Sequence, residues 1–241
     1  MRIDTALVTL GNIESRAKAQ LAIKMNLVLY NGVVVTKASF DAIDVQLITL
    51  VEQPLRYVSR GGDKLKLAID TFGLNFENKT VLDVGASTGG FTDCALQHGA
   101  KQVMCVDVGS NQLHSSIKEN KKVTWLENQD IRTFETKLKF DYVVVDVSFI
   151  NIESIVETLV SFMQPTTELI VLVKPQFEQL KRTKFSNGII KDPKLQRFSL
   201  DNVTKVLKQH NLIALANVST HGLSQDKERN IEFLLRVTHA K

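Results

Sequence analysis

From residue 61 onward, short apolar runs alternate with segments of helical periodicity. Most of these runs are apolar throughout rather than at every second residue, which is typical of strands buried on both faces of a parallel sheet. The pattern predicts an α/β, doubly wound, mostly parallel sheet of seven strands covered by helices. The expected strands are residues 80–84, 102–108, 123–126, 140–147, 168–174, 213–219 and 230–237, and the expected helices 63–72, 91–99, 111–120, 151–163 and 194–209.

The first 51 residues have a different pattern. Residues 14–24 fit an amphipathic helix with Asn12 or Ser15 as its N-cap. Two β-branched runs then flank Asn31-Gly32, a strong hairpin signal, and residues 45–51 resemble a third strand. We therefore expect a small α+β domain with its linker at residues 1–58 and the α/β domain at residues 59–241.

Composition narrows the class of protein. A net charge of +4 and a pI of 9.0 favour a polyanionic partner. The two cysteines, Cys94 and Cys105, lack disulfide or metal-site spacing, so we expect a reducing compartment and no metal. No signal peptide is recognisable, and no run reaches the roughly 18 to 20 apolar residues of a membrane span. A soluble cytoplasmic protein is expected, whose oligomeric state the sequence does not define.

The stretch VLDVGASTGGF, residues 81–91, follows the first expected strand of the large domain. Its glycines have neither dinucleotide-binding nor P-loop spacing. Asp83 would repel a pyrophosphate but attract the sulfonium and ammonium of S-adenosylmethionine. Asp107 ends the next strand, where an acid can bind ribose hydroxyls, and Asp130 is placed to meet the adenine. The sequence thus predicts S-adenosylmethionine as cofactor; the alternative is a purely structural turn.

Two residues at later strand ends are candidates for the chemistry. The position where amino-methylating enzymes carry an Asn/Asp-Pro-Pro-aromatic motif reads Asp146-Val-Ser-Phe149, and no Pro-Cys nucleophile is present. What remains is Asp146 and Lys174. A lysine at the end of a buried strand suits deprotonation of a hydroxyl, with a carboxylate orienting it. Alternatively, Asp146 caps the next helix and Lys174 is solvated.

Several motifs together resemble a known family. YVSRGGDKL, DVGASTGGFTD, VDVSFI, VKPQFE and NGIIKD are similar to the TlyA branch of FtsJ-like RNA 2′-O-methyltransferases, some of which are also named hemolysin A. MRID, ESRAKAQ and LVLYNGVVV resemble the RNA-binding module named after ribosomal protein S-four. The motifs span nearly the whole chain in the family's order. Met25-Asn26 departs from the usual Ala-Gly, but Asn can adopt the left-handed conformation after a helix.

The resemblance implies a Lys-Asp-Lys-Glu catalytic tetrad at Lys64, Asp146, Lys174 and Glu232. The segment just before Glu232 departs from the family's Pro/Gly-rich loop, which leaves Glu228 as an alternative for the fourth member. Lys174 would be the activating residue and Asp146 its partner, with Lys64 and Glu232 positioning the ribose. The cofactor-binding set expected with it is Asp83, Gly85, Ser87, Gly89, Gly90, Phe91, Asp107, Asp130 and Asp146.

The function implied is methylation of a ribose 2′-hydroxyl, of a cytidine in this family, in ribosomal RNA. Ribosomal RNA or ribosomal subunits are thus the expected partners, and a membrane is not. Two alternatives stay open: a non-catalytic RNA-binding or ribosome-assembly factor, and a hemolysin. The basic residues expected to contact RNA phosphates are Arg2, Arg16, Lys18, Lys24, Arg60, Lys181, Arg182 and Lys184.

Overall fold

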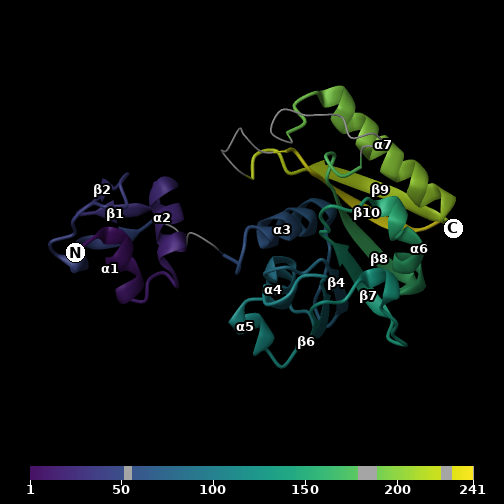
Figure 1. Cartoon of the computed structure of the whole chain (residues 1–241), viewed down its shortest axis with the longest axis horizontal. Helices are drawn as coiled ribbons and strands as arrows, with labels where there is room; N and C mark the ends of the chain where they lie inside the picture. Colours follow the sequence, from purple (N-terminus) through teal and green to yellow (C-terminus); the bar gives the residue numbers. More distant parts are fainter. Residues whose placement is uncertain (52–55, 179–188, 224–229, 241) are drawn as a thin grey trace. The chain divides into compact units, whose positions relative to one another are not determined.

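The computed structural model describes residues 1–51, 56–178, 189–223 and 230–240. The chain divides into two compact units, Met1–Arg56 and Tyr57–Lys241 (Figure 1). The sequence pattern placed the boundary two residues later, after Val58. In the structure Tyr57 is buried in the core of the second unit, and the Val58 N–H donates to Asp93 Oδ2 of that unit at 2.7 Å.

The first unit packs two helices against a three-stranded antiparallel sheet of order β2-β1-β3. Its core joins Ile3 and Leu7 of the first helix to Ile23 of the second and Val28 of the sheet. The elements are α1 (Ile3–Thr9), α2 (Arg16–Lys24), β1 (Val28–Tyr30), β2 (Val33–Val34), the 3-10 turn Val45–Leu47 and β3 (Ile48–Leu50).

The predicted helix and hairpin of this unit are confirmed. Ser15 is the N-cap of α2, and Asn31 and Gly32 form the turn with φ of 49° and 76°. Asn26 takes the left-handed conformation (φ 59°) expected of it after α2. The third predicted strand is shorter than expected because its first half forms a 3-10 turn. Helix α1 was not predicted: it has only seven residues and no side-chain cap.

The second unit contains a seven-stranded sheet of order β6-β5-β4-β7-β8-β10-β9. The first five strands in this order are parallel and β10 is antiparallel to both neighbours, so the predicted mostly parallel fold is confirmed. The strands are β4 (Thr80–Val84), β5 (Gln102–Val106), β6 (Val123–Leu126), β7 (Phe140–Val145), β8 (Met163–Val173), β9 (Leu212–Ser219) and β10 (Phe233–His239). The helices are α3 (Gly61–Phe72), α4 (Gly90–Gln97), α5 (Ser115–Lys118), α6 (Val156–Ser161) and α7 (Pro193–Gln209).

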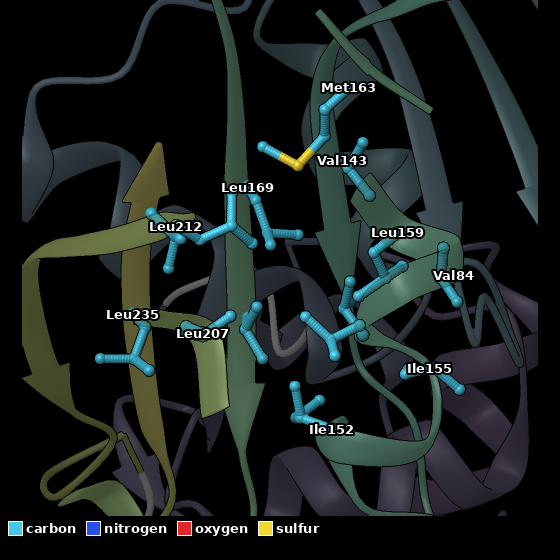
Figure 2. Packing of buried hydrophobic residues seen from close by; sticks show 14 of the residues in the cluster. Val84, Val143, Ile152, Ile155, Leu159, Met163, Leu169, Leu207, Leu212 and Leu235 are labelled. Atoms are coloured by element: carbon cyan, nitrogen blue, oxygen red, sulfur yellow. The ribbon is translucent and has the colours of Figure 1, made fainter. Parts of the chain in front are cut away.

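Helices cover both faces of this sheet, as continuous apolar strands require. Leu65 of α3 and Cys94 of α4 belong to one hydrophobic cluster. The other cluster joins Leu159 of α6 and Leu207 of α7 to strand residues such as Leu169 (Figure 2). Because strands with two covered faces cannot shift register without exposing apolar side chains, the ends of the strands are fixed in space.

Two predicted helices are shorter than expected, for local reasons. In the predicted helix 111–120, Asn111 has φ of 54°, and the N–H groups of Gln112 and Leu113 donate to the Glu127 carboxylate. Only α5 is helical there. In the predicted helix 151–163, a 3-10 turn capped by Asn151 precedes α6, and Ile155 between them departs from helical geometry.

The carboxyl ends of the parallel strands form one edge of the sheet, where ligands bind in open α/β folds. Strands β4, β5, β7 and β8 end there (Figure 1). The residues that directly follow them are Gly85, Asp107, Asp146 and Lys174, all four selected from the sequence as candidates.

Candidate active site

Four charged side chains form a continuous array at this edge. Lys174 Nζ lies 2.5 Å from Asp146 Oδ1, and Asp146 Oδ2 lies 3.8 Å from Lys64 Nζ. Lys64 Nζ in turn lies 2.6 Å from Glu232 Oε2. Two ammonium groups and two carboxylates therefore alternate in space, and the structure brings together all four residues of the predicted tetrad.

Each member of the array is set in place by a different element. Asp146 follows β7 and Lys174 follows β8, while Lys64 lies in the first turn of α3. Glu232 immediately precedes β10, one residue outside the strand in which the sequence placed it. Its N–H donates to Thr220 Oγ1 at 3.1 Å and its carbonyl accepts from the Thr220 N–H at 2.9 Å. Glu228, the alternative, lies outside the described residues.

Lys174 is nearly buried and has a second polar partner that the sequence analysis did not select. Its side chain is 9% exposed, and Nζ donates to Ser148 Oγ at 2.8 Å. Ser148 lies two residues beyond Asp146, within the VDVSFI motif, so the motif already contained the residue that binds Lys174. Lys174 therefore forms an ion pair with Asp146, and its directional hydrogen bond is the one to Ser148.

Two glycines of the loop are required by close approach. Gly85 has φ of 81°, and a Cβ atom there would lie 2.6 Å from the Asp146 carbonyl oxygen. A Cβ on Gly90 would lie 2.3 Å from Ser59 Oγ and 2.9 Å from the Gly62 nitrogen. The first glycine therefore permits the contact between the β4 and β7 ends, and the second brings α4 against the start of α3.

Two cavities lie beside the array, and both are lined by Gly85, Ser87, Asp146 and Ser148. The smaller, of about 320 Å³, also contacts Lys64, Lys174, Gly90, Phe91 and the segment Ser59–Gly61. The larger, of about 600 Å³, extends along the ends of β5 and β7 to Val108, Asp130 and Ile131. Their sizes match those of small-molecule sites.

Asp107 and Asp130 both line the larger cavity. Each oxygen of Asp107 accepts one backbone hydrogen bond at 2.7 Å, Oδ2 from Ser87 and Oδ1 from Gly109, and retains a free lone pair. The Asp130 carboxylate is instead bound to Arg132, whose guanidinium and N–H both donate to it. These hydrogen bonds lower the pKa of Asp130, so its carboxylate is firmly anionic.

Asp83 occupies a different position from the other predicted cofactor residues. It is completely buried beneath the glycine loop and lines neither of these two cavities. Its Oδ2 accepts a 2.6 Å hydrogen bond from Thr92 Oγ1, while Oδ1 has no hydrogen-bond partner among the residues that the structure describes. Burial raises the pKa of Asp83 to about 7. The loop therefore separates Asp83 from these cavities. Any attraction that Asp83 exerts on a cationic ligand acts across the loop and not by direct contact.

An exposed aromatic side chain that the sequence analysis did not select also lies here. Phe149 is 91% exposed, has φ of 66°, and lines the larger cavity. Its ring centroid lies 5.0 Å from that of Phe177, and the Phe177 ring lies 6.0 Å from Lys174 Nζ. Because this ring lines the cavity and its backbone has a strained positive φ, Phe149 is a candidate for contact with a ligand there.

The predicted RNA-contacting residues fall into three groups. Arg2 and Arg16 both contact Asp4, whereas Lys18 pairs with Glu14 and Lys24 is exposed at the end of α2. Arg60 precedes α3 and lines the smaller cavity. The remaining three, Lys181, Arg182 and Lys184, lie outside the described residues.

Within the described ranges, no cluster of three or more His, Cys, Asp or Glu side chains is arranged to hold a metal ion. The two cysteines are free and buried, and burial raises the pKa of the Cys94 thiol to about 12. No helix formed by the described residues is both long and apolar enough to span a membrane.

Residues 57–233 match the family model described as FtsJ-like methyltransferase, and residues 1–42 match the S4 domain. The chain belongs to the FtsJ-like methyltransferase family. The match to that model covers the whole charged array and both cavities. The resemblance seen in the sequence motifs is thereby confirmed, together with the methyltransferase fold and the amino-terminal S4 domain.

Several known proteins are similar to this chain over most of their length. The chain is 37% identical to a Bacillus subtilis protein provisionally named rRNA methyltransferase YqxC, over 98% of this chain and 85% of the relative. It is 34% identical to the 16S/23S rRNA (cytidine-2′-O)-methyltransferase TlyA of Mycobacterium tuberculosis, over 83% and 76%. A solved structure from Streptococcus thermophilus, provisionally named a hemolysin, superposes with a TM-score of 0.75 at 33% identity, over 100% of this chain and 89% of that one.

Proposed function

We propose that this FtsJ-like methyltransferase transfers a methyl group from S-adenosylmethionine to a ribose 2′-hydroxyl of ribosomal RNA, at a cytidine. The observation that carries the proposal is the alternating array of Lys174, Asp146, Lys64 and Glu232 beside a cavity of cofactor size. Similarity to the TlyA relative supports the choice of cytidine and of ribosomal RNA. The activity is assigned to the cytoplasm, where ribosomes are found.

The residues present fit the cofactor. Gly85 and Ser87 of the glycine loop line both cavities, and the larger cavity is partly apolar at Val108 and Ile131. Asp107 keeps acceptor capacity for ribose hydroxyls. We assign the adenosine part to the larger cavity and the methionine part to the smaller one. When bound, the cofactor supplies an electrophilic methyl group on a positively charged sulfur.

The chain's own residues then prepare the acceptor. Lys174 starts as the ammonium paired with Asp146; in the proposed step it releases one proton to solvent and then takes up the proton of the 2′-hydroxyl as that oxygen attacks the methyl group. Asp146 and Ser148 hold the Lys174 amine in a fixed direction at 2.5 and 2.8 Å. Lys64 lies beside Asp146 and Glu232, where its positive charge stabilises the developing oxyanion while Glu232 fixes its position. The main contribution is orientation of the oxygen for in-line attack.

Two further features suit an RNA substrate. The amino-terminal unit is an S4 domain with half-exposed arginines on its surface. The Phe149 and Phe177 rings beside Lys174 offer a surface on which an unpaired base can stack. These contacts would hold the nucleotide while the array acts on its ribose.

The test is transfer of labelled methyl groups to purified ribosomal subunits by wild-type protein and by Lys174→Ala. We expect label at a ribose oxygen, recovered as an alkali-resistant dinucleotide, in the wild type only. The substitution should abolish transfer, whereas cofactor binding measured by calorimetry should persist, because Lys174 does not line the larger cavity to which the adenosine part is assigned.

A matched control is Lys79→Ala, which removes another ion-paired lysine that precedes β4 at the far end of that strand. It should retain full transfer. Label recovered on a base, or equal transfer by wild type and Lys174→Ala, would contradict the proposal. Cofactor-independent binding to subunits without transfer would favour the assembly-factor alternative instead.

A further inference from the structure

Asp4 in the S4 domain is a completely buried carboxylate with several donors. Its Oδ1 accepts from Arg2 Nε at 3.0 Å, and its Oδ2 accepts from Arg2 Nη2 at 2.9 Å. The same Oδ2 accepts from Arg16 Nη2 at 3.1 Å and from Gln20 Nε2 at 2.9 Å. The hydrogen bonds from Arg2, more than those from the other partners, hold the pKa of Asp4 well below its usual range.

The two arginines expose the parts of their side chains that Asp4 does not use. Their side chains are 50% and 57% exposed, whereas Asp4 is hidden beneath them. Each guanidinium has five N–H donors in a planar fork, so each retains donors that Asp4 does not occupy. Arg2 is also fixed through its backbone, because it forms a bridge with Asp41 and its neighbour Ile3 donates to the Phe40 carbonyl.

The group concentrates positive charge at one place. Two guanidinium groups contact the same carboxylate oxygen, so the two arginines and the single buried aspartate together carry a net charge of +1. Arg16 is moreover the first residue of α2, and the first turn of α2 contains no acidic residue. A cation at a helix amino terminus opposes the helix dipole, whereas an anion there is stabilised.

We propose that Asp4 is a positioning residue that holds Arg2 and Arg16 together as a two-arginine clamp for one RNA phosphate. The inference rests on the proposed function, since it takes ribosomal RNA as the ligand. Planar guanidinium groups match phosphate oxygens with paired hydrogen bonds, and the shared carboxylate sets their spacing before binding. A preset clamp loses less side-chain entropy on binding than two independent surface arginines would.

The contact with Asp4 separates Arg2 and Arg16 from Lys18 and Lys24, the other two residues of this domain that the sequence predicted to contact RNA. Lys18 Nζ lies 2.7 Å from the carboxylate of Glu14, which precedes α2 by two residues and is outside the group around Asp4. Lys24 lies at the opposite end of α2 from Arg16. Only Arg2 and Arg16 share a buried partner among the described residues of this domain. We therefore expect most of the orientation-dependent phosphate contact from these two.

The experiment measures binding of the full-length protein to purified ribosomal subunits over a range of salt concentrations. Asp4→Asn should weaken binding about tenfold or more and reduce the slope of log affinity against log salt by about one unit, as expected for one lost phosphate contact. The maximal rate of methyl transfer at saturating subunits should stay within about twofold, because Asp4 belongs to the other unit.

Arg16→Lys keeps the positive charge but removes the planar fork of the guanidinium group. It is the second variant that tests the clamp if Asp4→Asn does not fold. We expect it to weaken binding by a similar factor. The matched control is Arg197→Lys, a surface arginine paired with Asp201 on α7, which should bind as wild type does. A folded Asp4→Asn or Arg16→Lys protein with unchanged affinity and salt slope would overturn the clamp. Wild-type protein that binds subunits but transfers no methyl would instead refute the proposed function.

Discussion

Lys64 Nζ and Glu232 Oε2 lie 2.6 Å apart, although one residue belongs to the first helix of the methyltransferase unit and the other directly precedes its last strand. This ion pair joins the start of α3 to the β9–β10 hairpin. The site is therefore complete only when the carboxyl-terminal hairpin has formed. Lys64 connects this hairpin to Asp146, because its amine contacts both Glu232 and Asp146.

Glu232→Gln should lower the rate of methyl transfer at saturating substrates about 10- to 100-fold, because Lys64 would lose its charged partner and its fixed position. Cofactor affinity should change little, since Glu232 does not line the larger cavity. Single-turnover transfer and calorimetry measure the two quantities. Glu168→Gln, which breaks the Arg236 ion pair elsewhere on β8 and β10, controls for a general effect on the sheet. Equal rates for Glu232→Gln and wild type would remove Glu232 from the array's function.

Ser148→Ala should reduce the maximal rate about tenfold and leave the KM for subunits nearly unchanged. Ser148 Oγ accepts the hydrogen bond that fixes the Lys174 amine. The alanine variant therefore keeps this amine but allows it to rotate. Ser148→Thr retains the hydroxyl and should recover most of the rate. Ser161→Ala, at the end of α6, is the control for a lost serine hydroxyl. A rate loss in Ser148→Thr equal to that in Ser148→Ala would argue for a packing role instead.

The sequence pattern was sufficient to predict the sheet and two members of the charged array, Asp146 and Lys174, because these two residues lie at strand ends. Continuous apolar runs predicted the end of β4 correctly, whereas the expected ends of β5, β7 and β8, at residues 108, 147 and 174, lie one or two residues beyond the observed ends at 106, 145 and 173. The residues at these ends still share one edge of a parallel sheet. Lys64 and Glu232 do not follow parallel strands. Their place in the array came from resemblance to a family, and the structure then brought them within reach of Asp146.

Other features depend on packing that a linear pattern does not contain. Asp83 was expected to face the cofactor, but its strand is covered on both faces and its carboxylate is buried against Thr92. Arg2 and Arg16 were recognised as basic, yet nothing in their spacing indicated that Asp4 joins them. Phe149 was quoted only as part of a motif, because its exposure depends on a left-handed backbone that favours glycine.

Glu178→Gln should alter the pH dependence of folding. Burial raises the pKa of Glu178 to about 7, so the folded protein binds a proton there that the unfolded chain releases near pH 4.5. Stability from this group is fully present below pH 4.5 and is lost as pH rises through about 7, by on the order of 3 kcal/mol. The glutamine keeps an acceptor for the Ile152 N–H and should make the variant more stable than wild type at pH 8 but not at pH 4.5.

Denaturant unfolding at the two pH values, followed by the fluorescence of Trp125, measures this difference in the second unit. Asp83 titrates in the same window with the same sign, so the variant should retain part of the wild-type slope. Glu157→Gln, an exposed carboxylate on α6, should behave as wild type does. A Glu178→Gln protein that tracks wild type across the whole range would show that Glu178 has an ordinary pKa.

Gly85→Ala should abolish cofactor binding, whereas Gly73→Ala should not. Both glycines have positive φ, 81° and 64°, so alanine at either costs about 1 to 2 kcal/mol of backbone strain. Only at Gly85 would the new Cβ also meet the Asp146 carbonyl oxygen, at 2.6 Å; at Gly73 it meets nothing within 4 Å. Calorimetry with S-adenosylhomocysteine separates the two, since strain alone predicts equal affinities. Wild-type affinity in Gly85→Ala would mean that the ends of β4 and β7 can separate without loss of the site.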